Sequence, residues 1–340
     1  MLGFPFIMFF TFIMFLGTFF CLSSAHWFGA WVGLEVNLMG FIPIMVQNKG
    51  VEEAESAMKY FLIQALGSSL MLFGFFLMFW NFGSWEFSFS GPYSESTMVM
   101  LGLLLKLGAA PLHFWIPSVV AGLSWYSVGL LLIWQKLAPL FLLSYFVVLS
   151  KEWMTLIIML SSIFGGVGGI NQTSIRGLLA YSSILHLGWM LAGMKVAVVY
   201  CFFYFILYSI ILILILTFFM QKSTWNNKQF SNFFSWSYFD RLYLVFMFLS
   251  MSGMPPLLGF FGKWMILLAL VGFKDLMISS VLVGGSILSL YYYLTLSFSL
   301  LMGKSEMSLM SFFMSSSLIL FGMLVNLMGV GVLHWLSIFL

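Results

Sequence analysis

Residues 105–111 read Leu105-Lys106-Leu107-Gly108-Ala109-Ala110-Pro111, which places a charge and a helix break inside a long apolar run. A second run of this kind reads Ser252-Gly253-Met254-Pro255-Pro256, with Lys263 a little farther along. Proline removes a helix hydrogen bond and clashes with the carbonyl four residues earlier. Within a bilayer, such a break persists only where protein or water satisfies the freed backbone groups. The two runs therefore predict broken membrane helices whose interruptions are enclosed by the protein.

The composition around these breaks is that of a membrane protein. Of the 340 residues, 62% are hydrophobic, 20% are aromatic and only 7% are charged. A soluble domain is about 45–50% apolar and about 25% charged, and many of its side chains must face water. The apolar runs are continuous over roughly 18–25 residues and do not alternate, which favours helices over a β-barrel. We therefore predict an all-α polytopic membrane protein.

Eleven helical spans can be drawn along the chain. They run at approximately residues 3–22, 26–46, 57–82, 96–121, 124–149, 153–170, 174–195, 197–220, 240–269, 276–300 and 312–338. The first span lacks a basic leader and is interpreted as a membrane helix, not as a cleaved signal. The longest polar stretch, residues 221–238, is a predicted loop. The whole chain, residues 1–340, is expected to form a single transmembrane domain.

The two broken spans, at about residues 96–121 and 240–269, are the fourth and the ninth of this series. Because they are five spans apart, they are expected to cross the membrane in opposite directions. Paired broken helices of opposite orientation are typical of transporters built from inverted repeats. Each break also has a lysine near it, which a simple kink would not need.

The loop cations give the predicted orientation. Seven of them share the side of the N-terminus: Lys49, Lys59, Arg176, Lys222, Lys228, Arg241 and Lys304. Three share the other side: Lys151, Lys195 and Lys274. Membrane proteins concentrate lysine and arginine on the inner face, so the N-terminus is expected there.

Four ionisable side chains fall inside apolar spans: Glu35, Lys106, Lys136 and Lys263. A charge at the centre of a span costs about 2.5–3.5 kcal/mol on insertion scales. Loss of hydration disfavours the charged form of a buried group, and an opposite charge nearby restores it. One carboxylate among three lysines therefore predicts an ion pair plus two lysines that load and release protons along one hydrated chain. The alternative is that each lysine snorkels or ties two helices together.

Two histidines, His113 and His186, also lie within predicted spans. They are either buried hydrogen-bonded residues or proton relays, since imidazole titrates in the useful range. Cys21 and Cys201 are interpreted as small buried hydrophobic residues. No group of His, Cys or carboxylate residues offers the three or four ligands of a metal site, so no metal or cofactor site is expected in this chain. A net charge of +3, without basic runs between stacking aromatics, gives no basis for a nucleic-acid partner.

The same residues carry a resemblance to a known family. The segments concerned are Ser24-Ala25-His26-Trp27, Trp31-Val32-Gly33-Leu34-Glu35-Val36-Asn37-Leu38, Lys59-Tyr60-Phe61-Leu62-Ile63-Gln64-Ala65, Leu105 to Trp115, Trp134-Gln135-Lys136-Leu137-Ala138-Pro139, Gly169-Ile170-Asn171-Gln172-Thr173 with Arg176, Leu179 to Met190, and Gly253 to Phe260 with Lys263-Trp264. In this order they resemble the mitochondrial NADH–ubiquinone oxidoreductase chain 2 family, antiporter-like membrane subunits of respiratory complex I. Residues 266–340 match that family only in hydropathy.

This resemblance implies two inverted five-helix repeats, each with a broken helix, and eleven spans in animal mitochondrial members. It implies that Glu35 pairs with Lys106, that Lys136 is the central proton carrier, and that Lys263 lies toward the exit. One departure is Ser118, where many relatives carry a glutamate. It puts a carboxylate role at that position in doubt.

The resemblance further implies a proton-translocating membrane-arm subunit of NADH:ubiquinone oxidoreductase in the mitochondrial inner membrane, with its N-terminus on the matrix side. NADH, flavin, iron–sulfur clusters and ubiquinone would bind other subunits. Its partners would be other membrane-arm subunits, including antiporter-like and small hydrophobic ones, together with membrane lipids. Two alternatives stay open: a cation/proton antiporter subunit of a multisubunit exchanger, and a purely structural membrane subunit.

Overall fold

The computed structural model describes residues 4–47, 50–83, 93–146, 151–221, 237–302 and 321–326. Every secondary-structure element in these ranges is a helix. Most of the predicted polar loop at 221–238, and most of the last predicted span at 312–338, lies outside the described residues. The chain divides into two compact units, residues 1–154 and 155–340.

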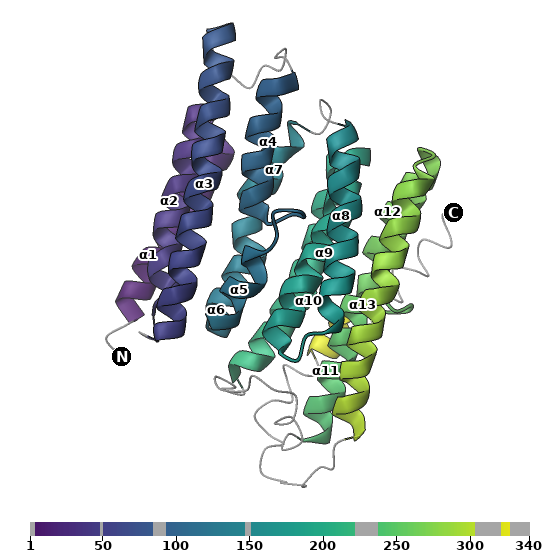
Figure 1. Ribbon diagram of the computed structural model, residues 1–340. Helices are drawn as coiled ribbons and strands as arrows, with labels where there is room; N and C mark the ends of the chain where they lie inside the picture. The colour runs from purple at the N-terminus through teal and green to yellow at the C-terminus, as the bar shows by residue number, and fades with distance from the viewer. Residues whose placement is uncertain are drawn as a thin grey trace. The chain divides into compact units, whose positions relative to one another are not determined.

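The first unit holds the first five predicted spans. Its elements are α1 (Phe4–Ser23), α2 (Trp27–Met45), α3 (Val51–Phe82), α4 (Tyr93–Leu107), α5 (Trp115–Gly122), α6 (Trp125–Gly129), a π-helical turn η1 (Leu130–Trp134) and α7 (Gln135–Ser144). The helices α1, α2 and α3 lie side by side, and α3 also packs along α4 (Figure 1). The broken span is the fourth of the five.

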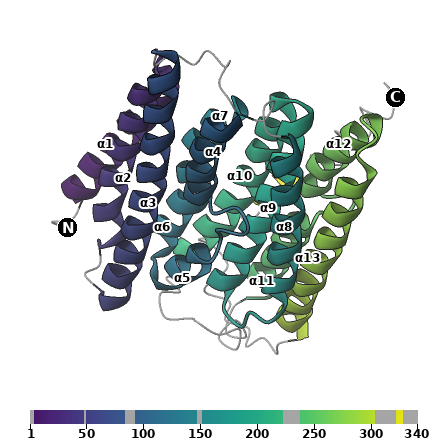
Figure 2. The ribbon, with the colours of Figure 1, turned by 45° about the horizontal axis from the view of Figure 1, so that its top comes forward.

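The second unit repeats this order. Its elements are α8 (Lys151–Ile170), whose first turn precedes the boundary, α9 (Ile175–Val196), α10 (Val198–Gln221), α11 (Tyr238–Ser252), α12 (Leu258–Gly272) and α13 (Leu276–Met302). The helix α9 is almost entirely buried and packs against α10, α12 and α13 (Figure 2). The broken span, α11 with α12, is again the fourth span of its unit.

Within the described residues, eight helices are long and apolar enough to cross a membrane, and the apolar segments Thr97–Leu107 and Leu258–Gly272 are shorter pieces. These shorter pieces belong to the two broken spans. The chain is therefore an all-α, multi-pass membrane protein, as its composition predicts.

The helix α3 begins at Val51, six residues before the predicted start. Two carboxylates, Glu52 and Glu53, occupy its first turn, where they complement the positive end of the helix dipole. Farther along the helix, the ammonium of Lys59 pairs with the carboxylate of Glu55 at 2.6 Å on the exposed face. Hydropathy alone misses this polar, amphiphilic start and places Lys59 beside a loop.

The fifth predicted span is not a uniform helix. The backbone N–H of Gln135 donates to the carbonyl of Leu130, five residues earlier, so η1 contains a π turn. Pro139 lies inside α7 and has no N–H to give to the carbonyl of Gln135. The residues Gln135 and Lys136 are thus bracketed by two departures from regular α-helical bonding. Such π turns occur frequently at functional sites.

A glycine turn ends α4 at the first break. Gly108 has φ +70°, a left-handed conformation that glycine adopts without steric strain. Its N–H donates to the carbonyl of Leu105, and the N–H of Ala109 donates to that of Leu104, each at 3.1 Å. This pair of bonds is a Schellman motif, which satisfies two of the carbonyls left free at a helix end.

The second break has the same turn. Gly253 has φ +81°, its N–H donates to the carbonyl of Ser250 at 3.1 Å, and the N–H of Met254 donates to that of Leu249 at 3.2 Å. Both predicted breaks are therefore present, and both begin with a Schellman motif in which glycine occupies the left-handed position.

Small residues let α1 and α2 approach closely. A Cβ atom added at Gly33 would lie 2.6 Å from the backbone nitrogen of Cys21, and Gly17 and Gly40 are similarly tight. Close approach through small residues is a recurrent means of helix association in membranes, where no hydrophobic force drives helices together.

We therefore expect Gly33→Ala to destabilise the first unit by about 1–3 kcal/mol, because the added methyl group overpacks the contact with α1. Gly284→Ala in α13 is the matched control, since no atom lies within 4 Å of a Cβ added there. Thermal unfolding of the two variants in lipid nanodiscs tests this. Equal unfolding temperatures would contradict the packing argument.

Candidate functional site

The first unit contains a buried ion pair. Lys106 occupies the last turn of α4, and its ammonium lies 3.5 Å from the carboxylate of Glu35 on α2. The lysine side chain is only 3% exposed and that of the glutamate 23%. The cation also stands at the negative end of the α4 dipole, which favours its charge. The expected pairing of these two residues is present.

The backbone beside this lysine is satisfied by side chains from neighbouring segments. The indole N–H of Trp115, at the start of α5, donates to the carbonyl of Leu105 at 3.1 Å. The amide of Gln64 on α3 donates to the carbonyl of Lys106 at 3.4 Å. These two donors meet the requirement that a break at membrane depth must be satisfied by the protein.

His113 lies within the same break. Its residue is buried, and its ring stacks on Phe114 with 4.4 Å between ring centroids. Its backbone carbonyl accepts from the N–H of Ile116, the bond that starts α5. The structure thus places this predicted relay residue between α4 and α5, in the unit that holds the ion pair.

Lys136 is buried on α7, directly after the π turn. The helix α7 packs against both α4 and α1. The structure therefore brings Glu35, Lys106 and Lys136 into one compact unit, on α2, α4 and α7.

A network of uncharged polar groups lies next to Lys136. The amide nitrogen of Asn37 on α2 donates to the side-chain oxygen of Gln135 at 2.8 Å, and the amide nitrogen of Gln135 donates back to the oxygen of Asn37 at 3.1 Å. The hydroxyl of Tyr60 on α3 donates to the same Gln135 oxygen at 3.4 Å. These residues stand in the quoted motifs, but the sequence alone gives them no role, since an uncharged side chain in a span carries no conspicuous cost.

The second unit holds the remaining lysine. Lys263 on α12 reaches back across the second break, and its ammonium donates to the carbonyl of Ser252, the last residue of α11, at 2.6 Å. The same nitrogen lies 6.0 Å from the ring centroid of Trp189, within cation–π range. A break and a buried ammonium are therefore joined in this unit as well.

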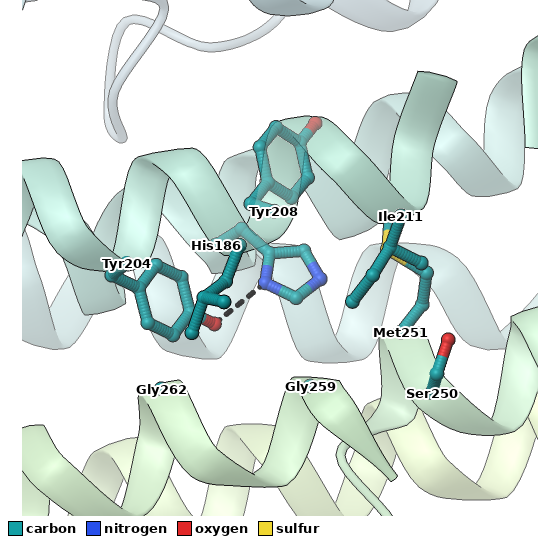
Figure 3. Close-up of a pocket in the computed structure, with 9 residues that line it drawn as sticks. His186, Tyr204, Tyr208, Ile211, Ser250, Met251, Gly259 and Gly262 are labelled. Atoms are coloured by element: carbon teal, nitrogen blue, oxygen red, sulfur yellow. Dashed lines mark hydrogen bonds between the residues drawn. The ribbon is translucent and has the colours of Figure 1, made fainter. Parts of the chain in front are cut away.

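His186 on α9 lines a small pocket of the second unit (Figure 3). Its Nδ1 is 2.7 Å from the hydroxyl of Tyr204 on α10, and its ring centroid is 4.9 Å from that of Tyr208. The cavity beside it, about 10 Å³, is close to the roughly 10–15 Å³ that one water needs. Ser250 of α11 and Gly259 of α12 line its far side, next to the second break. In an apolar span, tyrosine can serve either as a packing group or as a hydrogen-bonding group. The sequence alone therefore does not single out Tyr204 or Tyr208.

Within the described ranges, no three His, Cys, Asp or Glu side chains gather closely enough to hold a metal ion. Both cysteines, Cys21 and Cys201, are buried and unbridged. The buried groups described above offer acid–base chemistry: three lysines, one glutamate, two histidines and the hydroxyls beside them.

Comparison with known proteins shows the family of this chain. A family model described as NADH:quinone oxidoreductase/Mrp antiporter, transmembrane, matches residues 24–289. The NADH-ubiquinone oxidoreductase chain 2 of Anopheles gambiae is 40% identical over 294 residues, 86% of this chain and 85% of that protein. Its counterpart from Locusta migratoria is 38% identical over 287 residues, 84% and 82% of the two chains. A chain of respiratory complex I from Thermus thermophilus, solved with bound aureothin, has a similar fold, with a TM-score of 0.79, 23% identity and 94% and 76% of the two chains covered.

We expect Glu35→Gln to destabilise the protein by about 3 kcal/mol, since it leaves the buried Lys106 ammonium without its counter-charge. The control is Glu55→Gln, which breaks the exposed pair with Lys59 and should change stability by about 0.3–0.5 kcal/mol. Replacing both members, as Glu35→Gln with Lys106→Met, should recover most of the loss. Thermal unfolding of the three variants measures this, and a Glu35→Gln effect no larger than that of the control would refute it.

Proposed function

This chain belongs to the NADH-ubiquinone oxidoreductase chain 2 family of antiporter-like membrane proteins, and we propose that its buried lysines and glutamate move protons across the membrane. The observation that carries this is the Glu35–Lys106 ion pair at a helix break, in the unit that also buries Lys136. Stability alone would not select such a pair, because a well-packed apolar replacement is often equally stable or more stable.

In the proposed mechanism, changes in neighbouring subunits of the complex alter the Glu35–Lys106 pairing. The positive charge presented to Lys136 then changes, and with it the affinity of the Lys136 amine for a proton. Lys136 loads a proton from one side when its charge is favoured and releases it when the field reverses. The proposed relays are His113, which is buried within the first break, and His186, which is hydrogen-bonded to Tyr204.

Lys263 is proposed to receive the proton in the second unit and to pass it outward. Its position at the second break, with one N–H held by the Ser252 carbonyl, supports this role. The cavity beside His186 has room for about one water, which a proton needs in order to pass between groups that do not touch.

The chain is a subunit of an enzyme complex whose family name is NADH-ubiquinone oxidoreductase. We propose that electron transfer from NADH to ubiquinone, through flavin and iron–sulfur clusters, takes place in other subunits. The proposed partners are the neighbouring membrane-arm subunits and lipids of the mitochondrial inner membrane, with the N-terminus facing the matrix.

The family model also includes Mrp antiporters, so a cation/proton exchanger is the second candidate. The identities of 38–40% with chain 2 proteins over most of both chains favour the first candidate. Sodium-driven proton flux through reconstituted vesicles that lack NADH would favour the exchanger instead.

Lys136→Gln in the assembled complex is expected to lower coupled proton translocation by roughly a hundredfold or more, since an amide cannot take up and release the proton. Assembly should persist, because the amide still offers hydrogen bonds. The measurement is acidification of proteoliposomes, followed with a pH-sensitive dye while NADH is oxidised. Lys59→Gln, which neutralises an exposed lysine, is the control. Normal pumping by the Lys136 variant would overturn the mechanism.

Lys263→Arg separates the two roles of the second lysine. Arginine can still cap the Ser252 carbonyl and keeps its positive charge, but it does not release a proton in proteins. We expect this variant to assemble and yet to lose proton translocation, whereas Lys263→Met should lose both the cap and the activity. Blue-native electrophoresis reports assembly, and the dye assay reports pumping. If Lys263→Arg pumps at the normal rate, Lys263 has only a structural role.

A further inference from the structure

The helix α2 carries two functional side chains on different faces. Successive residues of an α-helix are about 100° apart, so Glu35 and Asn37 point in nearly opposite directions. Glu35 faces Lys106 of α4, and Asn37 faces Gln135 of α7. A shift or rotation of α2 that follows a change in the ion pair therefore acts on Gln135 as well.

Two hydrogen bonds of opposite direction join the amides of Asn37 and Gln135, and this pair of bonds transmits such a shift. Each amide donates to the other, which fixes the orientation of both side chains. Asn37 is 3% exposed, so separating the pair would leave a buried amide without a partner. The Tyr60 hydroxyl donates a second bond to the same Gln135 oxygen and so joins α3 to the network.

The next residue after Gln135 is Lys136, and the backbone around both is irregular. The π turn precedes them, and Pro139 leaves the Gln135 carbonyl without its usual helix partner. A segment with fewer regular helix bonds yields more readily to a pull on one side chain. The amide pair is therefore attached to α7 at the point where Lys136 can change its position.

We propose that Gln135 is a positioning residue, which couples the Glu35–Lys106 ion pair to Lys136 through its reciprocal amide bonds with Asn37. The proposal rests on the proton-transfer function assigned above. Gln135 does not itself carry a proton. It sets where the Lys136 amine stands for each state of the ion pair.

The test compares three variants in the assembled complex. Gln135→Leu leaves Asn37 buried without a partner, whereas Asn37→Leu with Gln135→Leu replaces both amides by apolar groups of similar size, a change that can be nearly neutral for stability. Asn37→Gln with Gln135→Asn exchanges the two amides and retains an amide pair. Gln47→Leu is the control, since it removes another amide bond of the same unit, from the residue two positions beyond α2 to Ser124.

The double leucine variant is expected to assemble and unfold like the wild type while pumping roughly 2- to 30-fold more slowly, the range that couplings of 0.5–2 kcal/mol correspond to. The exchanged pair should recover a substantial part of the rate, and Gln47→Leu should pump normally. NADH oxidation and dye-reported acidification are measured in the same vesicles.

A purely structural role gives a different pattern: the double leucine variant would recover both stability and pumping. That result would overturn the proposal while leaving the Lys136 mechanism intact, provided that Lys136→Gln still abolishes pumping. Normal pumping by Lys136→Gln would instead remove the proposed function itself. Failure of the exchanged pair to recover any rate, in a complex that assembles, would also count against a coupling role.

Discussion

The arrangement of this protein depends on one constraint: a helix interrupted in an apolar environment leaves carbonyl groups that must find donors. Both units meet it first with the same Schellman turn, around Gly108 and Gly253. A proline follows each glycine three positions later, at Pro111 and Pro256. The turn leaves further carbonyls free, and the side chains that satisfy them differ between the two units.

In the first unit the donors are neutral, the indole of Trp115 and the amide of Gln64, and the ammonium of Lys106 is left to face Glu35. In the second unit the ammonium of Lys263 is itself a donor. Ten residues after the glycine, the first unit has Ser118 where the second has Lys263. The two repeats thus use the same backbone turn at the break. The lysine precedes the break in the first unit, as Lys106, and follows it in the second, as Lys263. At Ser118, where many relatives carry a glutamate, this unit needs no charged side chain to satisfy the backbone of its break.

The sequence predicts the helical class, the order of the spans and both breaks. Continuous apolar runs, and a glycine followed three positions later by a proline, determine the local backbone structure. It also singles out the charged residues, since a charge in a span is costly enough to be conspicuous. It does not predict the π turn at Leu130–Trp134, whose apolar residues would suit a regular α-helix equally well. Nor does it predict the partners Gln64, Tyr204 or Gln135, because which neutral group meets which depends on how distant helices pack.

The Asn37–Gln135 pair illustrates this last point. The two residues are 98 positions apart in the sequence. Only the approach of α2 and α7 makes their side chains a pair. That Glu35 forms an ion pair with some lysine follows from the sequence, because opposite charges in an apolar medium have few other ways to be stabilised. That its partner is Lys106 is what the family resemblance implies.

The bond from Lys263 to the Ser252 carbonyl is compatible with the proton transfer proposed for this lysine. An ammonium has three N–H bonds, and an amine that has lost its proton still has two. The same nitrogen can therefore go on donating to that oxygen whether it is charged or neutral. A carboxyl group in this place would lose its donor on ionisation, and the end of α11 would be uncapped once in every cycle. With lysine, the hydrogen bond between the two half-helices can therefore persist through the proton transfer that we propose.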